Sequence, residues 1–120
     1  MSDGISARQA ALGLLTSVLD EGMLLQQTLS DPNGPLAGLN PSERARAQRL
    51  CQTVLRHIEQ ADATLAPFLR KNPPKEVQNI LRLAVVELAI DKAAAHGVVN
   101  AAVTLMQQGR KTTHSAGLAN

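Results

Sequence analysis

Residues 75–92 form a segment that is apolar around most of its circumference when the sequence is projected onto a helix. Two of its faces are apolar, one with Ile80 and Leu88 and the other with Leu83 and Ile90. The remaining polar strip is narrow and consists chiefly of Gln78, Asn79, Arg82 and Glu87. A helix with apolar residues on most sides has to be covered by other elements. The sequence therefore predicts that this helix lies at the centre of a helical bundle.

The kinds of apolar residue also favour helices over sheets. Apolar residues make up 44% of the 120 positions, but Phe68 is the single aromatic, and alanine, leucine and valine dominate. Alanine and leucine are strong helix formers, whereas sheets favour β-branched and aromatic residues. A chain of this length can bury a core without disulfides or a metal. We therefore predict one all-α domain that spans residues 1–120.

The first forty residues predict two helices and a surface loop. Ser6 is a suitable N-cap for a helix that runs to about Asp20, and Gly22 is placed to end it. A short second helix over residues 23–29 comes next. Residues 31–39 then contain two prolines and two glycines, which mark a surface loop.

The third predicted helix has the clearest start signal. Asn40 can cap it, Pro41 can occupy its first position, and Glu43 lies near the positive end of the helix dipole. An almost continuous apolar stripe follows, formed by Ala47, Leu50, Cys51, Val54, Leu55 and Ile58. Three arginines lie along the opposite side of the same helix, namely Arg46, Arg49 and Arg56. The pattern predicts an amphipathic helix with arginine on its solvent-facing side.

Two further segments predict shorter helices. Residues 61–71 form one that contains Pro67, and the following Asn-Pro-Pro sequence ends it. Residues 97–107 form the other, and we expect its buried face to hold Val99, Ala102, Val103 and Met106. Asn100 lies among these apolar residues, so we expect it to be buried and to tie neighbouring backbone together by hydrogen bonds rather than to contact a ligand.

The last residues predict an interrupted helix. Residues 109–113 break the apolar pattern, and Thr113 or Ser115 can cap one more helix that has barely begun at Asn120. We therefore expect the chain to be an amino-terminal piece of a longer protein.

The residues needed for the common kinds of catalysis do not form a pattern. Cys51 is the only thiol, and its place in the apolar stripe predicts a buried, unreactive side chain with a raised pKa. The three histidines are scattered, without a cysteine or carboxylate at ligand spacing, so we expect no metal site. No glycine-rich loop between a strand and a helix indicates a nucleotide site. The sequence thus predicts a domain that acts by binding, with no catalytic residue and no cofactor of its own.

Cellular location is indicated by three features. A lone cysteine fits a reducing compartment, no apolar run approaches the ~20 residues of a membrane span, and the first residues lack the basic region of a signal peptide. The default expectation is the cytoplasm.

Basic residues are concentrated in the later part of the chain. The net charge is only +2, but residues 1–36 carry a charge of −3 and residues 37–120 a charge of +5. A positive field over the later helices can attract phosphate. Arg82 lies on the polar strip of the central helix, where it can either pair with Glu87 or Gln78 or reach an external phosphate.

Five short motifs in the expected order resemble the NusB-like fold, a bundle of about seven helices. They are ARQAAL at residues 7–12, LCQTVLR at 50–56, NILRL at 79–83, HGVVNAAV at 96–103 and AGLAN at 116–120. Two branches share this fold: the antitermination factor NusB and the amino-terminal domain of RsmB-type (Sun/Fmu-like) ribosomal RNA methyltransferases. The second and fifth motifs are more similar to the methyltransferase branch. In that branch the catalytic cysteines and the S-adenosylmethionine site lie in a later domain.

The resemblance implies an RNA-binding accessory domain whose partners are ribosomal RNA and the methyltransferase domain of the same polypeptide. The candidate RNA contacts are Arg8, Arg46, Arg49, Arg82, Arg110 and Lys111. We expect mainly phosphate contacts and little base readout, because the chain is poor in aromatic residues. Two alternatives remain open: a free-standing NusB-type transcription factor, and a protein–protein module that does not bind RNA.

Overall fold

The computed structural model describes residues 4–69 and 73–119, with backbone alone for residues 110–119. It contains no strand in these ranges, so the predicted all-α class is confirmed. The α-helices are α1 (Ile5–Leu15), α2 (Leu25–Ser30), α3 (Pro41–Arg56), α4 (Ile58–Leu65), α5 (Lys75–Ala89) and α6 (Ala95–Ala119). A π-helical segment, Thr16–Asp20, continues α1, and a 3-10 turn, Ala66–Phe68, continues α4.

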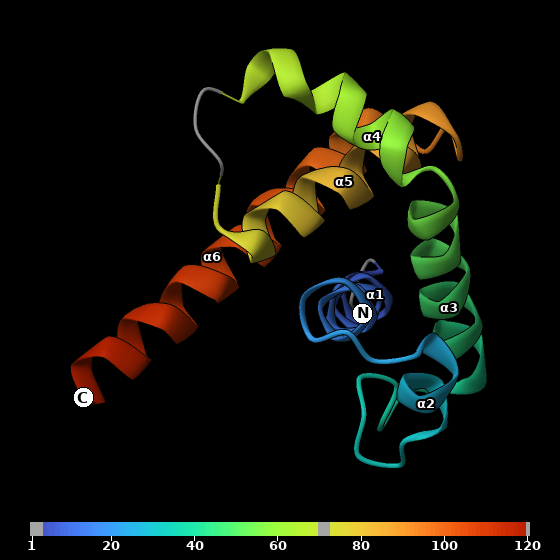
Figure 1. The fold of residues 1–120 in the computed structure, drawn as a ribbon, viewed down its shortest axis with the longest axis vertical. Helices are drawn as coiled ribbons and strands as arrows, with labels where there is room; N and C mark the ends of the chain where they lie inside the picture. Colours follow the sequence, from blue (N-terminus) through green and yellow to red (C-terminus); the bar gives the residue numbers. More distant parts are fainter. Residues whose placement is uncertain (1–3, 70–72, 120) are drawn as a thin grey trace.

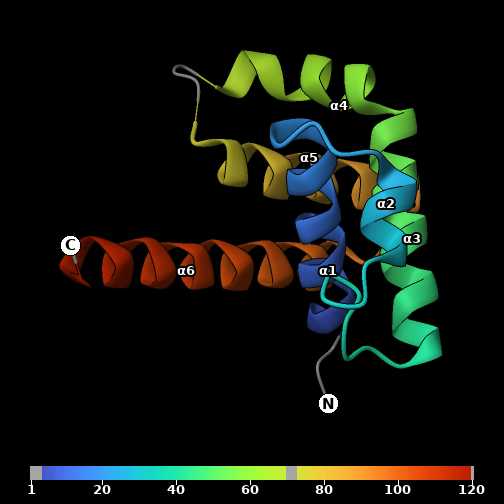
Figure 2. The ribbon, with the colours of Figure 1, turned by 60° about the horizontal axis from the view of Figure 1, so that its bottom comes forward.

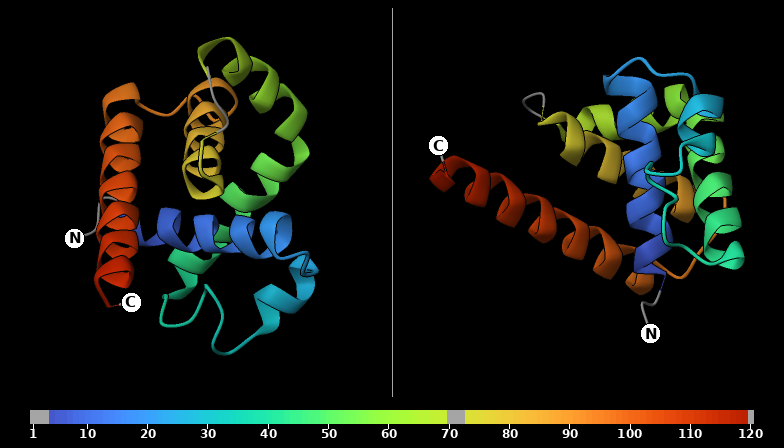
Figure 3. Two further views of the ribbon diagram at one scale, coloured as in Figure 1. Left: turned by 60° about the vertical axis from the view of Figure 1, so that its left-hand side comes forward. Right: turned by 90° about the horizontal axis from the view of Figure 1, so that it is seen from below.

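The helices α1 and α5 share the middle of the molecule. Figure 1 looks almost along α1, with α3 on one side of it and α5 and α6 on the other. As predicted, α5 is central, since it packs against α1, α3, α4 and α6. The turned view in Figure 2 shows the carboxyl-terminal part of α6 extending beyond the other helices. Figure 3 shows that α1 crosses α5 and α6 rather than running alongside them.

The main core lies where α1, α3 and α5 meet. It contains Leu14 and Leu15 from α1, Leu50 from α3, and Leu83 and Val86 from α5, all fully or almost fully buried. A smaller cluster joins α6 to this core, and it consists of Leu12, Ile80 and Leu105. Burial of large aliphatic side chains contributes roughly 1.5–3 kcal/mol each, so these contacts hold the crossing helices together.

The start of the first helix differs from the prediction. Its N-cap is Gly4, with φ of 82°, and the helix begins at Ile5, so the prediction of Ser6 as the cap was wrong. Glycine adopts this left-handed conformation without the steric cost that a side chain brings. The predicted end is confirmed, because the chain leaves the π-helical segment through Gly22, with φ of 72°.

The start of α3 agrees in detail with the start that the sequence predicted. The backbone N–H of Glu43 donates to Asn40 Oδ1 at 2.8 Å, and the Glu43 carboxylate accepts from the Asn40 N–H at 3.4 Å, so the two residues form a capping box. The apolar stripe is buried through Val54. The helix then stops at Arg56, because His57 leaves the helical conformation, and Ile58 begins α4 instead of ending α3. The predicted start of the fourth helix at residue 61 was therefore too late.

The polar strip of α5 is not on the outside of the fold. Asn79 and Glu87 are among its most buried residues, whereas Leu88 and Ile90 are about 40% exposed. Both buried polar groups have partners on other helices, described below, which offsets the cost of removing them from water. The apolar residues near the end of α5 are exposed because α5 ends at Ala89 and the chain turns toward α6.

The predicted buried face of α6 is confirmed in part, because Ala102 and Met106 pack against the smaller cluster. Val98, Ala101 and Leu105 are buried, whereas Val99 and Val103 are about half exposed. Asn100 is exposed too, so its predicted role as a buried tie was wrong. The predicted break at Gly109 is also absent, since α6 runs from Ala95 to Ala119.

The glycine at the predicted break has a packing role. A Cβ atom on Gly109 would lie 2.8 Å from a carboxylate oxygen of Glu76. The missing side chain therefore leaves room for the Glu76 carboxylate beside α6, at the expense of helix propensity.

Candidate nucleic-acid interface

Arg8 of α1 is buried in an ion pair with Glu87 of α5. Its Nε and Nη2 atoms donate to the two carboxylate oxygens at 2.8 and 2.9 Å, and both side chains are less than a tenth exposed. This paired geometry is the strongest arrangement that an arginine and a carboxylate can form. Arg8 thus joins two core helices, and its guanidinium does not lie on an open surface.

A second polar network connects three helical segments through α5. Arg82 donates to both carboxylate oxygens of Asp62 in α4, at 2.7 and 3.0 Å, and to Asn79 Oδ1 at 2.9 Å. Asn79 in turn donates to Asp20 Oδ2 at 3.2 Å. The predicted partners of Arg82, Glu87 and Gln78, were wrong. The guanidinium is held inside this network instead of being directed toward an external phosphate.

The outer face of α3 carries the accessible arginines. Arg49 and Arg56 are both exposed, and neither forms an ion pair with any residue that the structure describes. Arg46 is half-buried, with its guanidinium beside Gly4 and close to that of Arg8. The three arginines therefore run along α3 from the start of α1 toward the start of α4. Anionic groups can reach this face without displacing a partner carboxylate.

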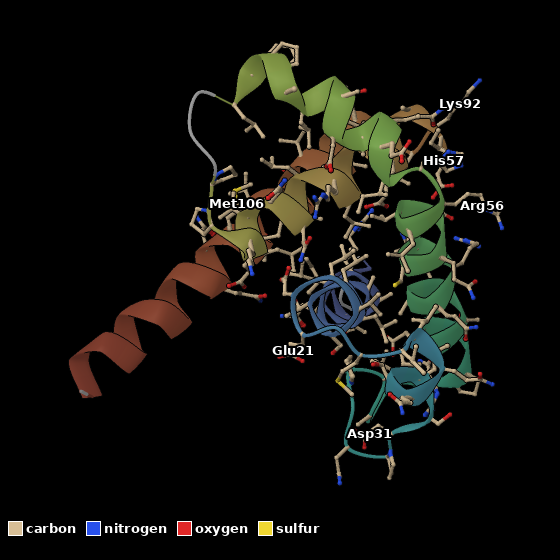
Figure 4. The ribbon with its side chains drawn as sticks, in the orientation of Figure 1. Glu21, Asp31, Arg56, His57, Lys92 and Met106 are labelled. Atoms are coloured by element: carbon tan, nitrogen blue, oxygen red, sulfur yellow. The ribbon has the colours of Figure 1, made fainter. Side chains whose placement is uncertain are left out.

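One more basic residue, Lys92, extends this face at the far end of α3. Figure 4 shows Arg56, His57 and Lys92 at one corner of the molecule, where α3 ends, α4 begins and α5 turns toward α6. Lys92 is exposed and has φ of 54°, the one positive φ at a non-glycine position in the described ranges. Sequence reasoning missed Lys92, because only the fold brings it beside the end of α3.

The opposite side of α1 is acidic. A groove of about 570 Å³ lies between α1, the start of α5 and α6, and Asp20, Glu21 and Glu76 line it. Glu21 is labelled in Figure 4, well away from the corner that holds Arg56. Carboxylates repel phosphate, so the charge distribution favours α3 over this groove as a nucleic-acid interface.

Comparison with known proteins settles the family. A model of the NusB family matches residues 5–120, nearly the whole chain. The chain belongs to the NusB family. The protein named "Ribosomal RNA small subunit methyltransferase B" from Xanthomonas campestris pv. campestris (strain ATCC 33913 / DSM 3586 / NCPPB 528 / LMG 568 / P 25) is 31% identical to it over 104 residues. The match covers 83% of this chain but 23% of that relative, so the chain spans about a quarter of the relative's length. No solved structure matches the chain.

The resemblance to the NusB family is thereby confirmed. Residues of the motifs form ion pairs, hydrogen bonds and core contacts that hold the helices together. Arg8 of the first motif forms the ion pair with Glu87, and Asn79 and Arg82 of the third form the polar network. The second motif supplies Leu50, Cys51 and Val54 to the core. These three motifs of the NusB-family chain therefore contribute to its packing, and Arg56, at the end of the second motif, also belongs to the accessible face of α3. The side chains of the fifth motif, residues 116–120, lie outside the described part of the structure.

Cys51 has the environment that the sequence predicted. It is fully buried in the core, and desolvation raises the pKa of its thiol from 9.0 to about 12. A thiol in this state is a poor nucleophile, because the thiolate is the reactive form. Among the described side chains, those of residues 4–69 and 73–109, no three of histidine, cysteine, aspartate or glutamate are grouped to hold a metal ion. No helix in the same ranges is long and apolar enough to cross a membrane.

The six candidate RNA-binding residues thus fall into three groups. Arg8 and Arg82 are engaged with carboxylates inside the fold. Arg46 and Arg49 lie on the accessible side of α3. The side chains of Arg110 and Lys111 lie outside the described part of the structure.

Proposed function

We propose that this NusB-family chain is a non-catalytic, RNA-binding accessory domain of a 16S ribosomal RNA 5-methylcytosine methyltransferase. Its partners are then ribosomal RNA and the methyltransferase domain of the same polypeptide. In this proposal S-adenosylmethionine binds to that other domain, and the protein works in the cytoplasm. The similarity to a relative named as a small-subunit ribosomal RNA methyltransferase supports the proposal.

The accessible arginines of α3 are the observation that carries the RNA-binding role. Arg49 and Arg56 are exposed and lack ion-pair partners in the described ranges, and Arg46 continues the same face. Unpaired guanidinium groups in a row can follow a phosphate backbone, because each neutralised phosphate releases condensed counterions. Contacts of this kind position RNA without reading its sequence. Arg8 and Arg82 have a structural role in this proposal, which is to hold α1, α4 and α5 together.

The test compares arginines on two sides of one helix. The Arg46→Ala/Arg49→Ala double variant removes two charges from the outer face of α3. Arg44→Ala is the matched control, because Arg44 is also exposed but lines a different groove, beside Leu36 and Leu39. The probe is a labelled fragment of small-subunit ribosomal RNA, measured by fluorescence anisotropy. We expect the double variant to bind about tenfold or more weakly and Arg44→Ala to bind nearly as well as the unaltered chain. Equal affinity of all three proteins would count against the proposal.

A free-standing transcription antitermination factor is the second candidate, because the family model that matches residues 5–120 carries the NusB description. The reading frame beyond Asn120 separates the two candidates. Continuation into a methyltransferase domain supports the accessory-domain proposal, and a stop codon shortly after residue 120 favours the transcription factor.

A module that binds only protein is the third candidate. The half-exposed Val99 and Val103 on α6 are the observation that favours it, since they lie four residues apart on one side of the helix. Charge substitutions on α3 would leave such a module's binding unchanged, so the α3 experiment also tests this alternative.

A further inference from the structure

A small pocket lies between α4 and α5, beside the basic corner. His57, Gln60 and Thr64 form one wall, and Val85, Ala89 and Ile90 form the other. Its volume is about 240 Å³, below the ~300–1,000 Å³ of pockets that enclose a whole small-molecule ligand. The pocket therefore fits one planar group rather than a complete cofactor.

The polar wall of the pocket is organised for hydrogen bonding. His57 Nδ1 and Gln60 Oε1 are 2.9 Å apart, and the Thr64 hydroxyl donates to the backbone oxygen of Gln60. When Nδ1 donates to Gln60, the Nε2 atom of His57 is left as an acceptor, and the Gln60 amide nitrogen keeps its N–H groups as donors. An adjacent donor and acceptor match the edge of a nucleobase, and the imidazole ring offers a stacking surface.

Two basic residues lie close in the sequence to residues that line this pocket. Arg56 directly precedes His57, and Lys92 follows Ile90 by two residues, so each basic residue is next to a pocket wall. Figure 4 shows Arg56, His57 and Lys92 together at this corner. Four acidic residues are close to the pocket walls in the sequence. Asp62 and Glu87 are engaged in the ion pairs with Arg82 and Arg8. Glu59 is two positions from His57 and Ala61, which places it on the far side of α4, and Asp91 is the neighbour of Lys92.

The conformation of Lys92 is an independent indication. A lysine with positive φ is strained relative to glycine, the usual residue at such a turn. Strained backbone of this kind is found more often at functional sites than elsewhere. At this corner the side chain supplies a charge that glycine cannot.

From these features we infer that the corner binds one unstacked nucleotide of single-stranded RNA. The base enters the pocket beside His57, and Arg56 and Lys92 contact the adjoining phosphates. The inference rests on the proposed RNA-binding function and adds a base-binding position to the phosphate-binding face of α3. It also makes single-stranded RNA the preferred form, because a paired base cannot leave the helix to enter the pocket without a free-energy cost.

The test uses the 120-residue chain and three fluorescein-labelled probes. The first is a single-stranded oligoribonucleotide of about ten nucleotides, which is within the usual range for single-strand binding sites. The second has the same length but lacks its bases at the central positions, and the third is an RNA duplex. Ala89→Leu fills the pocket from an exposed position at the end of α5, and Ala63→Leu is its control at an exposed position of α4 outside the pocket. His57→Ala removes the ring, and His57→Phe restores a stacking surface.

We expect Ala89→Leu and His57→Ala to weaken single-strand binding about tenfold while the slope of log affinity against log salt stays the same. Ala63→Leu should bind as the unaltered chain does, and His57→Phe should recover most of the affinity. With the base-free probe, Ala89→Leu should cause no loss. Lys92→Gly should raise the melting temperature, because it relieves the positive φ, and yet weaken binding and reduce the salt slope by about 0.7.

The outcomes separate this inference from the function on which it rests. If the unaltered chain shows no salt-dependent RNA binding, the proposed function fails. If it binds with a salt slope but Ala89→Leu and His57→Ala match the control, the pocket inference is overturned and the phosphate-binding face of α3 stands. The pocket inference would also be overturned if Ala89→Leu weakened binding to the intact probe and to the base-free probe by the same factor. Circular dichroism of each variant establishes that the helices are intact.

Discussion

Arg8 and Glu87, 79 positions apart, form a buried ion pair in which two parallel hydrogen bonds of 2.8 and 2.9 Å join α1 to α5. The pair lies beside the core where α1, α3 and α5 meet. It explains why Glu87, on the polar strip of α5, faces inward, since its carboxylate pairs there with a cation from α1. It also takes Arg8 out of the set of residues that can contact a ligand.

Removing one partner of this pair should be strongly destabilising. Arg8→Ala or Glu87→Ala leaves the other charge buried without a counterion, which costs about 3–5 kcal/mol in the free energy of unfolding. Replacing both residues with apolar side chains of similar volume, as in Arg8→Met/Glu87→Met, should cost much less than the sum of the single changes. Urea unfolding followed by circular dichroism measures these differences.

The exposed Arg49→Ala is the control for this experiment, with an expected change within about 0.5 kcal/mol. Single variants that also change stability by less than about 1 kcal/mol would show that Arg8 and Glu87 are solvated in solution, contrary to the geometry described above.

Asn79 should be a stability determinant, although it looks like a surface residue in the sequence. Asn79→Ala removes the link between Asp20 and Arg82 and leaves buried hydrogen-bonding groups without partners, a cost of about 1–3 kcal/mol. Asn100→Ala is the matched control, because Asn100 is exposed on α6 and should tolerate the change. The urea concentration at the midpoint of unfolding is measured for both variants. Asn79→Ala should lower it, and Asn100→Ala should leave it nearly unchanged. Equal sensitivity of both positions would contradict the network.

Cys51 should be chemically protected and should make stability fall at high pH. Burial raises the pKa of its thiol to about 12, so the folded chain keeps the proton when the unfolded chain, with a pKa near 9.0, releases it. The unfolded state therefore binds fewer protons between about pH 9 and pH 12, and the free energy of unfolding decreases as the pH rises through that range.

Thiol labelling measures the protection of Cys51 directly. At pH 8 an aromatic disulfide reagent should react with Cys51 at a rate set by opening of the fold, and the rate should rise sharply in urea. Reaction in native buffer as fast as that of a free thiol would contradict the buried position. Cys51→Ala should reduce the loss of stability above pH 9.

The sequence predicted the start of α3 correctly, because that start depends on residues that are close together in the chain. Asn40 and Glu43 are three positions apart, and the capping box between them can be recognised without any knowledge of the rest of the fold. The burial of Cys51 followed in the same way from the apolar stripe of α3. In both cases the pattern that supports the prediction lies within one helix.

The errors on α5 and α6 arose where partners distant in the sequence decide which residues are buried. Asn79 and Glu87 were assigned to a polar strip because their partners, Asp20 and Arg8, are 59 and 79 positions away. In α6, Val98 and Val99 are adjacent, so the apolar pattern allows two faces, and contact with α1 and α5 selects the one with Val98.

The sequence predicted only part of the candidate interface. The rest depends on residues that are distant in the sequence. Arg46 and Arg49 could be chosen because their spacing places them on one side of a helix. Arg8 and Arg82 were chosen for their charge, and nothing local indicates that Glu87 and Asp62 engage them. Lys92 was missed because the turn after α5 comes to the end of α3 only in the folded chain.

The most direct test of the RNA-binding face is the salt dependence of affinity for a single-stranded ribosomal RNA fragment. The unaltered chain should show a linear decrease of log affinity with log salt, with a slope of about 0.7 for each phosphate contact. The Arg49→Ala/Arg56→Ala variant should lower that slope by about 1.4, whereas Arg44→Ala, on another side of α3, should leave it unchanged. A slope that is the same in all three proteins would contradict a role for the outer face of α3 in binding RNA.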